Sequence, residues 1–191
     1  MLGLLPGSRA SEITHIGDTF LRAARLVKDR HPALQVLLPA ASAERYRQIE
    51  ARLPLAADLS VRLLQGGSRD VMAAADVLLL ASGTATLEAA LLDAPMVVGY
   101  RMQALSWALL ARLLKTPYAA LPNILAGHAL VPEYIQAGMT ADALAEALLP
   151  LLEPDGGRDQ RQGFADIRSS LQLDFDAALT GAIDRTLLQH A

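Results

Sequence analysis

Two short glycine-containing turns hold the groups with the clearest potential for chemistry. The first glycine turn, residues 6–9, follows the apolar pair Leu4 and Leu5, and the second glycine turn, residues 82–84, follows the apolar run 77–81. Each turn precedes an amphipathic helical pattern, so each is predicted to place the unpaired N–H groups of a helix N-terminus at the end of a buried strand. Those N–H groups and the helix dipole favour a bound phosphate. The pair of turns predicts a site for one diphosphate.

The same residues also fit a more ordinary role. Ser82, Gly83 and Thr84 could form a plain helix N-cap, and neither turn has the spacing of a Walker loop or of the three-glycine dinucleotide motif. Two such turns at strand ends nevertheless favour phosphate, because ligands of α/β proteins bind at the carboxyl ends of parallel strands. We therefore predict that these three residues, together with Gly7 and Ser8, contact the diphosphate.

Charged side chains flank both turns. Arg9 could be a surface cation beside Glu12, but a guanidinium at a helix N-terminus opposes the helix dipole unless an anion compensates it. This conflict favours contact between Arg9 and the ligand. Glu88 lies about one helical turn beyond the second glycine turn, where its carboxylate could accept a hydrogen bond from a ribose hydroxyl or simply face solvent or a lysine. Gln65 and Gly66 begin a third strand-to-helix turn, which fits a plain connection at least as well as contact with a nucleobase.

Apolar runs and helical periodicity alternate along the chain. Strands are predicted at residues 2–5, 35–39, 61–64, 76–81 and 95–100. Helices are predicted from residue 10 to before His31, and at 43–53, 69–75, 84–92, 103–114, 132–137, 140–152, 158–171 and 175–189. The stretch 121–127 is predicted to be irregular. This order predicts an α/β fold, a Rossmann-like doubly wound parallel sheet of order 3-2-1-4-5, in which both glycine turns follow neighbouring strands.

The chain divides near Pro154. Residues 1–154 are predicted to form the Rossmann-like domain and residues 155–191 a C-terminal helical tail, whose apolar stripe favours a homodimer formed by exchange of the tail through residues 154–157. The apolar helix 104–114 is interpreted as a core or inter-domain helix, with acyl-chain or membrane contact as the alternative. Because the first predicted strand, residues 2–5, has only four residues, we expect the chain to begin inside a strand of a larger protein.

Composition excludes several classes of function. A hydrophobic content of 52% in 191 residues excludes a disordered chain, and a formal charge of −3 with scattered arginines argues against a nucleic-acid partner. The absence of cysteine and the wide spacing of four histidines predict no metal site and fit a reducing cytoplasm. No apolar run reaches the roughly 20 residues that span a bilayer. No Ser-His-Asp arrangement or paired carboxylates can be identified, so the catalytic residues are unknown.

The segments around these turns, taken in order, resemble one known family. They are residues 5–13, 81–88, 95–101, 121–127 and 132–136, and together they are similar to the C-terminal half of lipid-A-disaccharide synthase. The resemblance implies the C-terminal domain of an inverting glycosyltransferase with two Rossmann-like domains, the GT-B fold. The implied reaction transfers 2,3-diacylglucosamine from UDP-2,3-diacylglucosamine to 2,3-diacylglucosamine 1-phosphate, without a cofactor or metal.

The resemblance also implies roles for particular residues. Arg9 and the second glycine turn would lie near the diphosphate, Glu88 at the ribose, and Gln65 and Gly66 beside uracil. Asn123 and Gln136 match positions that the family keeps around the donor. The family's N-terminal domain, with the acceptor site and the expected catalytic carboxylate, has no counterpart in these residues, so we expect this chain to bind the donor but to be inactive alone.

Two other functions remain open. One is another UDP-sugar enzyme of the same architecture, such as a 2-epimerase, and the other is a stand-alone nucleotide-binding module without catalysis. For the enzyme, the expected location is the cytoplasm, with peripheral contact to the cytoplasmic face of the inner membrane.

Overall fold

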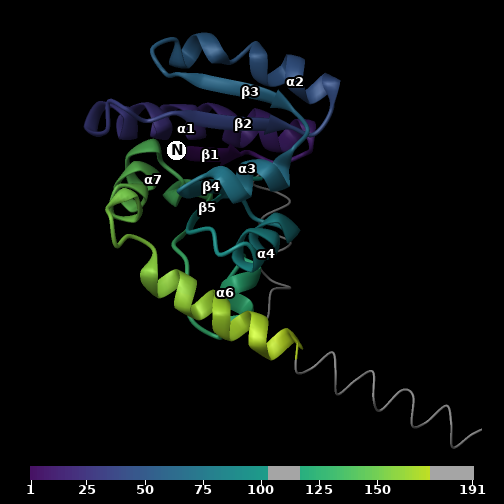
Figure 1. The fold of residues 1–191 in the computed structure, drawn as a ribbon. Coiled ribbons are helices and arrows are strands. Elements are labelled where there is room, and N and C mark those ends of the chain that lie inside the picture. The colour runs from purple at the N-terminus through teal and green to yellow at the C-terminus, as the bar shows by residue number, and fades with distance from the viewer. Residues whose placement is uncertain (103–116, 173–191) are drawn as a thin grey trace, which may run out of the picture.

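The structure, a computed structural model, describes residues 1–102 and 117–172. Its centre is a six-stranded sheet of order β3-β2-β1-β4-β5-β6, in which each neighbouring pair is parallel (Figure 1). The strands are β1 (Leu2–Leu5), β2 (Val36–Ala40), β3 (Val61–Gln65), β4 (Val77–Ala81), β5 (Met96–Tyr100) and β6 (Glu133–Ile135). The strand order reverses between β1 and β4, which places the two glycine turns side by side at one edge of the sheet.

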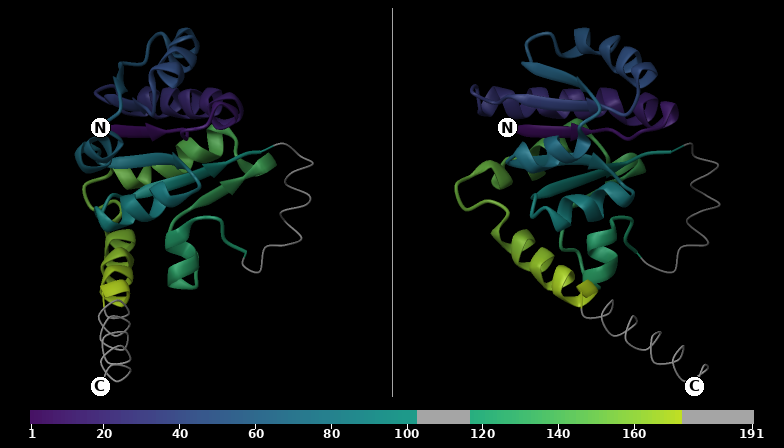
Figure 2. Two further views of the ribbon diagram at one scale, coloured as in Figure 1. Left: turned by 90° about the vertical axis from the view of Figure 1, so that its right-hand side faces the viewer. Right: turned by 45° about the vertical axis from the view of Figure 1, so that its right-hand side comes forward.

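Helices cover both faces of the sheet (Figure 2). The helices are α1 (Ala10–Arg30), α2 (Ala43–Glu50), α3 (Ser68–Ala74), α4 (Thr84–Leu91), α6 (Leu121–Ala126) and α7 (Ala141–Leu148), with 3-10 turns at Leu53–Ala56, Gln136–Gly138 and Pro150–Leu152. Residues 158–172 are also helical. In Figure 1 this last segment runs past α4 and α6.

The two faces carry separate apolar clusters because side chains alternate along each strand. Leu2 and Leu4 of β1 belong to the cluster under α1 and α7, whereas Leu5 belongs to the cluster under α3 and α4. The same alternation continues in β4, where Leu79 lies in the first cluster and Leu78 in the second. A central strand buried on both sides explains the continuous apolar runs in the sequence.

The longest helix, α1, follows the first glycine turn and packs on the sheet through one apolar face. Its buried residues recur with the 3.6-residue period, at Ile13, Ile16, Gly17, Phe20, Leu21, Ala23, Ala24 and Val27. The helix ends at Arg30, two residues before Pro32, because a proline disfavours helical geometry in the residue before it. This packing fixes the direction in which the first turn of α1 points.

The helical segment 158–172 is attached to the sheet by polar and apolar contacts. The side chain of Gln160, 5% exposed, accepts a hydrogen bond from Met96 N at 2.7 Å and donates one to Met96 O at 3.1 Å. Phe164 is fully buried in the cluster under α3 and α4, and Arg168 pairs with Asp93. The beginning of the predicted tail therefore packs on the sheet domain of its own chain.

The predicted strands and their order are confirmed, with ends shifted by at most one residue. Two predictions were wrong. Residues 132–137, predicted as a helix, contain strand β6 followed by a 3-10 turn, because this segment pairs with β5. The stretch 121–127, predicted to be irregular, contains helix α6. The predicted helices 103–114 and 175–189 lie outside the described residues.

Candidate functional site

The two glycine turns open onto one cavity of about 420 Å³ at the carboxyl ends of the strands. Predicted site residues on its wall are Gly7, Ser8, Arg9, Gly66, Ser82, Gly83, Thr84 and Glu88. The ends of β1, β2 and β4 and the start of α3 complete the wall, with Ala40, Ala81 and Met72 among the apolar residues. These eight residues, which the sequence predicted to form one site, therefore lie around one cavity in the fold.

The second glycine turn presents free donors to this cavity. Gly83 is the N-cap of α4 and has φ +150°, a conformation that side-chain-bearing residues rarely adopt. Across residues 1–102 and 117–172, no acceptor pairs with the N–H groups of Gly83, Thr84 or Ala85. These donors, at the positive end of the α4 dipole, form an anion site.

The first glycine turn differs in part from the prediction, because two of its backbone donors are already occupied. The Glu12 carboxylate accepts hydrogen bonds from Ser8 N at 3.0 Å and from Arg9 N at 3.1 Å. The prediction of unpaired N–H groups was therefore wrong for Ser8 and Arg9, whereas within the described residues no acceptor pairs with the N–H groups of Gly7, Ala10 and Ser11. The spacing Ser-x-x-x-Glu, with an acidic residue in the first turn of α1, was the available sequence signal of this cap.

Arg9 is an exposed cation on the wall of the cavity. Its Nη1 lies 3.5 Å from Glu12 Oε1, but its side chain is 78% exposed, whereas that of Glu12 is 15% exposed. An exposed ion pair of this kind contributes little to stability, so Arg9 can exchange Glu12 for an anion in the cavity at small cost. Arg9 can therefore pair with Glu12 in the free protein and contact the ligand when it binds, so the two roles predicted for it are compatible.

Tyr100, at the carboxyl end of β5, was not identified from sequence. Burial raises the pKa of its hydroxyl, the negative charge of Glu12 raises this pKa further, and Arg9 lowers it. The phenol is therefore close enough to sense both charges of the first turn. Tyr100 belongs to the segment 95–101 that resembles the family, but nothing in that segment alone indicates that β5 ends beside Arg9 and Glu12.

Glu88 and one residue of the third turn, Gly66, also line the cavity. Glu88 is exposed and lies four residues after Thr84, on the same side of α4, as predicted. Gly66, φ +76°, lines the cavity, but its N–H is donated to Ala40 O at 2.8 Å. Gln65 is exposed and is absent from the cavity wall.

Within the described residues, no three His, Asp or Glu side chains are grouped so that they could hold a metal ion. The same residues include no helix that is long and apolar enough to cross a membrane.

A sequence profile described as lipid-A-disaccharide synthetase matches residues 1–175. The chain belongs to the lipid-A-disaccharide synthase family. A relative from Cellvibrio japonicus, named lipid-A-disaccharide synthase, is 43% identical over 98% of this chain and 49% of its own length. The chain thus spans about half the length of the curated relatives it matches.

Solved structures show the same fold at low identity. S. aureus TarM in complex with UDP has a TM-score of 0.54 at 12% identity, covering 92% of this chain and 34% of that one. A Listeria monocytogenes protein described as a UDP-N-acetylglucosamine 2-epimerase has a TM-score of 0.53 at 15% identity, covering 92% of this chain and 45% of that one. These likenesses confirm the α/β fold of GT-B glycosyltransferases.

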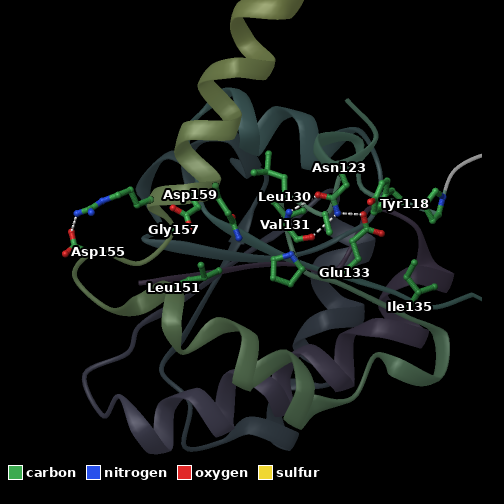
Figure 3. A pocket seen from close by; sticks show the side chains of 15 residues that line it. Tyr118, Asn123, Leu130, Val131, Glu133, Ile135, Leu151, Asp155, Gly157 and Asp159 are labelled. Atoms are coloured by element: carbon green, nitrogen blue, oxygen red, sulfur yellow. Dashed lines mark hydrogen bonds and ion pairs between the residues drawn. The ribbon is translucent and has the colours of Figure 1, made fainter. Parts of the chain in front are cut away.

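Two residues chosen for their resemblance to the family lie apart from the cavity wall. Asn123, in α6, is 1% exposed and is bonded to Val131 and Glu133 beside a second hollow of about 770 Å³ (Figure 3). Gln136 follows β6 with φ +54°, and its carbonyl accepts a hydrogen bond from Arg101 Nη2 at 3.2 Å. Gln136 Nε2 is buried and has no partner within the described residues. Direct contact of either residue with the donor substrate stays a prediction, and for Asn123 it would require its side-chain amide to give up one of the hydrogen bonds to Val131 or Glu133.

Proposed function

We propose that this chain forms the donor-binding half of a lipid-A-disaccharide synthase. The cavity binds the UDP group of UDP-2,3-diacylglucosamine, and the complete enzyme transfers the sugar to 2,3-diacylglucosamine 1-phosphate with inversion. The acceptor site and the catalytic base lie in the part of the family that these residues do not match. Support comes from membership of the family and from the structural neighbour S. aureus TarM, which is in complex with UDP.

One observation carries this proposal: the free N–H groups of Gly83, Thr84 and Ala85 face the same cavity as Arg9. A departing UDP gains negative charge on its diphosphate as the bond to the sugar breaks. Fixed donors at that place stabilise the charge without reorganising during the reaction. Arg9 adds a charge-assisted hydrogen bond, and Glu88 accepts one from the ribose.

Calorimetric titration of the chain with UDP tests the proposal. We expect saturable binding that UMP reproduces only weakly, because UMP lacks the second phosphate. The affinity should be unchanged by EDTA, since no metal ion is part of the proposed site. A chain that is folded by circular dichroism but does not bind UDP at millimolar concentration would contradict the proposal.

The alternatives differ in what they predict for a complete enzyme. A 2-epimerase would interconvert UDP-sugars without an acceptor, whereas the proposed transferase releases UDP only when 2,3-diacylglucosamine 1-phosphate is present. A stand-alone module would bind UDP but release nothing with either substrate. Product analysis by mass spectrometry, with the chain joined to the remaining half of a family member, separates the three.

The acyl chains of the proposed substrates indicate where in the cell the enzyme would act. We propose peripheral contact with the cytoplasmic face of the inner membrane, because acyl chains of both substrates favour a bilayer. Self-association through the C-terminal tail is also part of the proposal. Sedimentation should show a dimer that is lost when residues 173–191 are deleted, a truncation that leaves Gln160 and Phe164 in place.

A further inference from the structure

We infer that Asn123 and Glu133 are positioning residues for the second glycine turn: they hold residues 119–121 against that turn and so orient its free N–H groups without contacting the ligand. The inference rests on the proposed UDP site. It assigns a role to two polar side chains that lie outside the wall of the donor cavity.

Glu133, the first residue of β6, holds this segment from one side. Its Oε2 accepts a hydrogen bond from Ala119 N at 2.8 Å, and its Oε1 accepts one from Ala120 N at 3.0 Å. Oε1 also accepts a bond from Asn123 Nδ2 at 2.5 Å. A carboxylate is needed here, because both of its oxygens face donors, and backbone N–H groups bind an ionised acceptor more strongly than a neutral one.

Asn123 holds the helix that follows. Its Nδ2 donates to Val131 O at 2.9 Å and its Oδ1 accepts from Val131 N at 2.7 Å, so the side chain pairs with the backbone just before β6 (Figure 3). With the bond to Glu133, both amide hydrogens and the carbonyl oxygen have protein partners. The side chain is therefore committed to the protein rather than available to a ligand.

The other side of residues 119–121 is bonded to the second glycine turn. Ser82 Oγ donates to Ala119 O at 2.7 Å, and Leu121 N donates to Thr86 Oγ1 at 3.2 Å. Thr86 Oγ1 in turn donates to Gly83 O at 2.8 Å. Thus the segment that Glu133 holds from β6 is bonded directly to Ser82 of the turn and, through Thr86, to Gly83.

The second glycine turn needs such support from outside. Gly83 provides no capping side chain, and a glycine has the largest conformational freedom to lose when it is fixed. Without the supporting bonds, the turn would be ordered only when the ligand binds, and that ordering would reduce the affinity. The support from β6 therefore acts on UDP affinity by keeping the donors in place beforehand.

Substitution of Glu133 separates this role from ligand contact. Glu133→Gln keeps the volume but offers one acceptor oxygen where three donors converge, and we expect UDP affinity to fall on the order of tenfold. The amide resonances of Gly83, Thr84 and Ala85 should shift in the absence of UDP. Glu146→Gln, which removes an exposed carboxylate of α7 on the opposite face, is the matched control and should change neither.

A double-mutant cycle with Ser82→Ala tests whether both residues act through the same segment. We expect the loss of UDP affinity in the double variant to be clearly smaller than the sum of the single losses. Additive losses, or unshifted amide resonances in Glu133→Gln, would overturn the inference. If the unmodified chain does not bind UDP, the proposed function fails, while the resonance shifts still decide whether Glu133 positions the turn. Should Glu133→Gln not fold, Asn123→Ser is tested by the same two measurements.

Discussion

Gly83 carries the backbone conformation on which the anion site depends. A Cβ at this position would meet nothing within 4 Å, so a substitution strains the backbone without causing a clash. We expect Gly83→Ala to lower the free energy of unfolding by about 1–3 kcal/mol and to weaken UDP binding, because the turn relaxes toward negative φ.

Thermal unfolding and calorimetry of Gly83→Ala check this expectation. Gly138→Ala is a matched control, since its Cβ also meets nothing within 4 Å and the φ of Gly138 lies outside the positive range. Equal stability of the two variants would show that φ at Gly83 is not a constraint.

Arg9 and Glu88 are expected to act on the ligand and not on the fold. Both side chains are exposed on the cavity wall, and each is proposed to make one polar contact with UDP. Arg9→Ala and Glu88→Ala should each weaken UDP binding on the order of tenfold, with little change in melting temperature. Loss of the cooperative melting transition in either variant would indicate a structural role instead.

Tyr100 should make stability depend on alkaline pH. Because burial and Glu12 raise the pKa of its hydroxyl in the folded protein, the unfolded chain releases this proton first as the pH rises through about 10. The folded state then binds more protons than the unfolded state, so the contribution of Tyr100 to stability is present below about pH 10 and is lost above it.

Urea unfolding of the unmodified chain and of Tyr100→Phe at about pH 8 and about pH 10.5 measures this contribution. The unmodified chain should lose more stability between the two pH values than the variant does. Equal losses would show that the hydroxyl is not shielded as the structure indicates.

The sequence predicted the cavity residues better than their hydrogen bonds. Glycine and serine after an apolar run indicate a strand-to-helix turn, and this signal located both turns correctly. Which N–H groups remain free depends on side chains one helical turn away, because the Glu12 carboxylate accepts hydrogen bonds from two backbone donors of the first turn. The bonds of Asn123 and Glu133 join residues on separate elements, so no local pattern in the sequence reveals them.

At the scale of elements, the helical segment 158–172 is fixed to the start of β5 by Gln160. Replacing its side chain leaves the buried N–H and C=O of Met96 without partners, and each unsatisfied group costs about 1–3 kcal/mol. Gln160→Ala should therefore destabilise the whole domain, as measured by urea unfolding. Gln162→Ala, two residues further along the same helix and exposed, should have almost no effect.

Strands that are buried on both faces are the elements most readily predicted from sequence. β4 is an uninterrupted apolar run, and its neighbours β1 and β5 are nearly so. β6 is only three residues long and half-buried, and it includes Glu133. Its extended conformation comes from pairing with β5, which is a tertiary interaction that short-range periodicity does not record.

At the scale of the whole molecule, the helical extension shares the apolar cluster under α3 and α4 with the sheet domain. The predicted division near residue 154 places Phe164 in the tail, yet this side chain is buried against α4 and β5 residues. If two copies exchanged their tails while Phe164 stayed packed on its own domain, the exchanged segment would have to begin after Phe164, not at residues 154–157. Truncation experiments should therefore keep residues up to 172.

The pairing of β1 with β4 has a consequence for how the protein folds. Leu2 lies opposite both Val36 of β2 and Val77 of β4. The central strand β1 can therefore pair fully only after β4, which is synthesised much later, is available. Contacts between residues so distant in sequence form slowly, because a long loop must close first. The two glycine turns follow these two strands, and the cavity between them exists only after this closure. A ligand that bridges the turns therefore stabilises an arrangement that forms late in folding. It should slow unfolding more than it accelerates refolding.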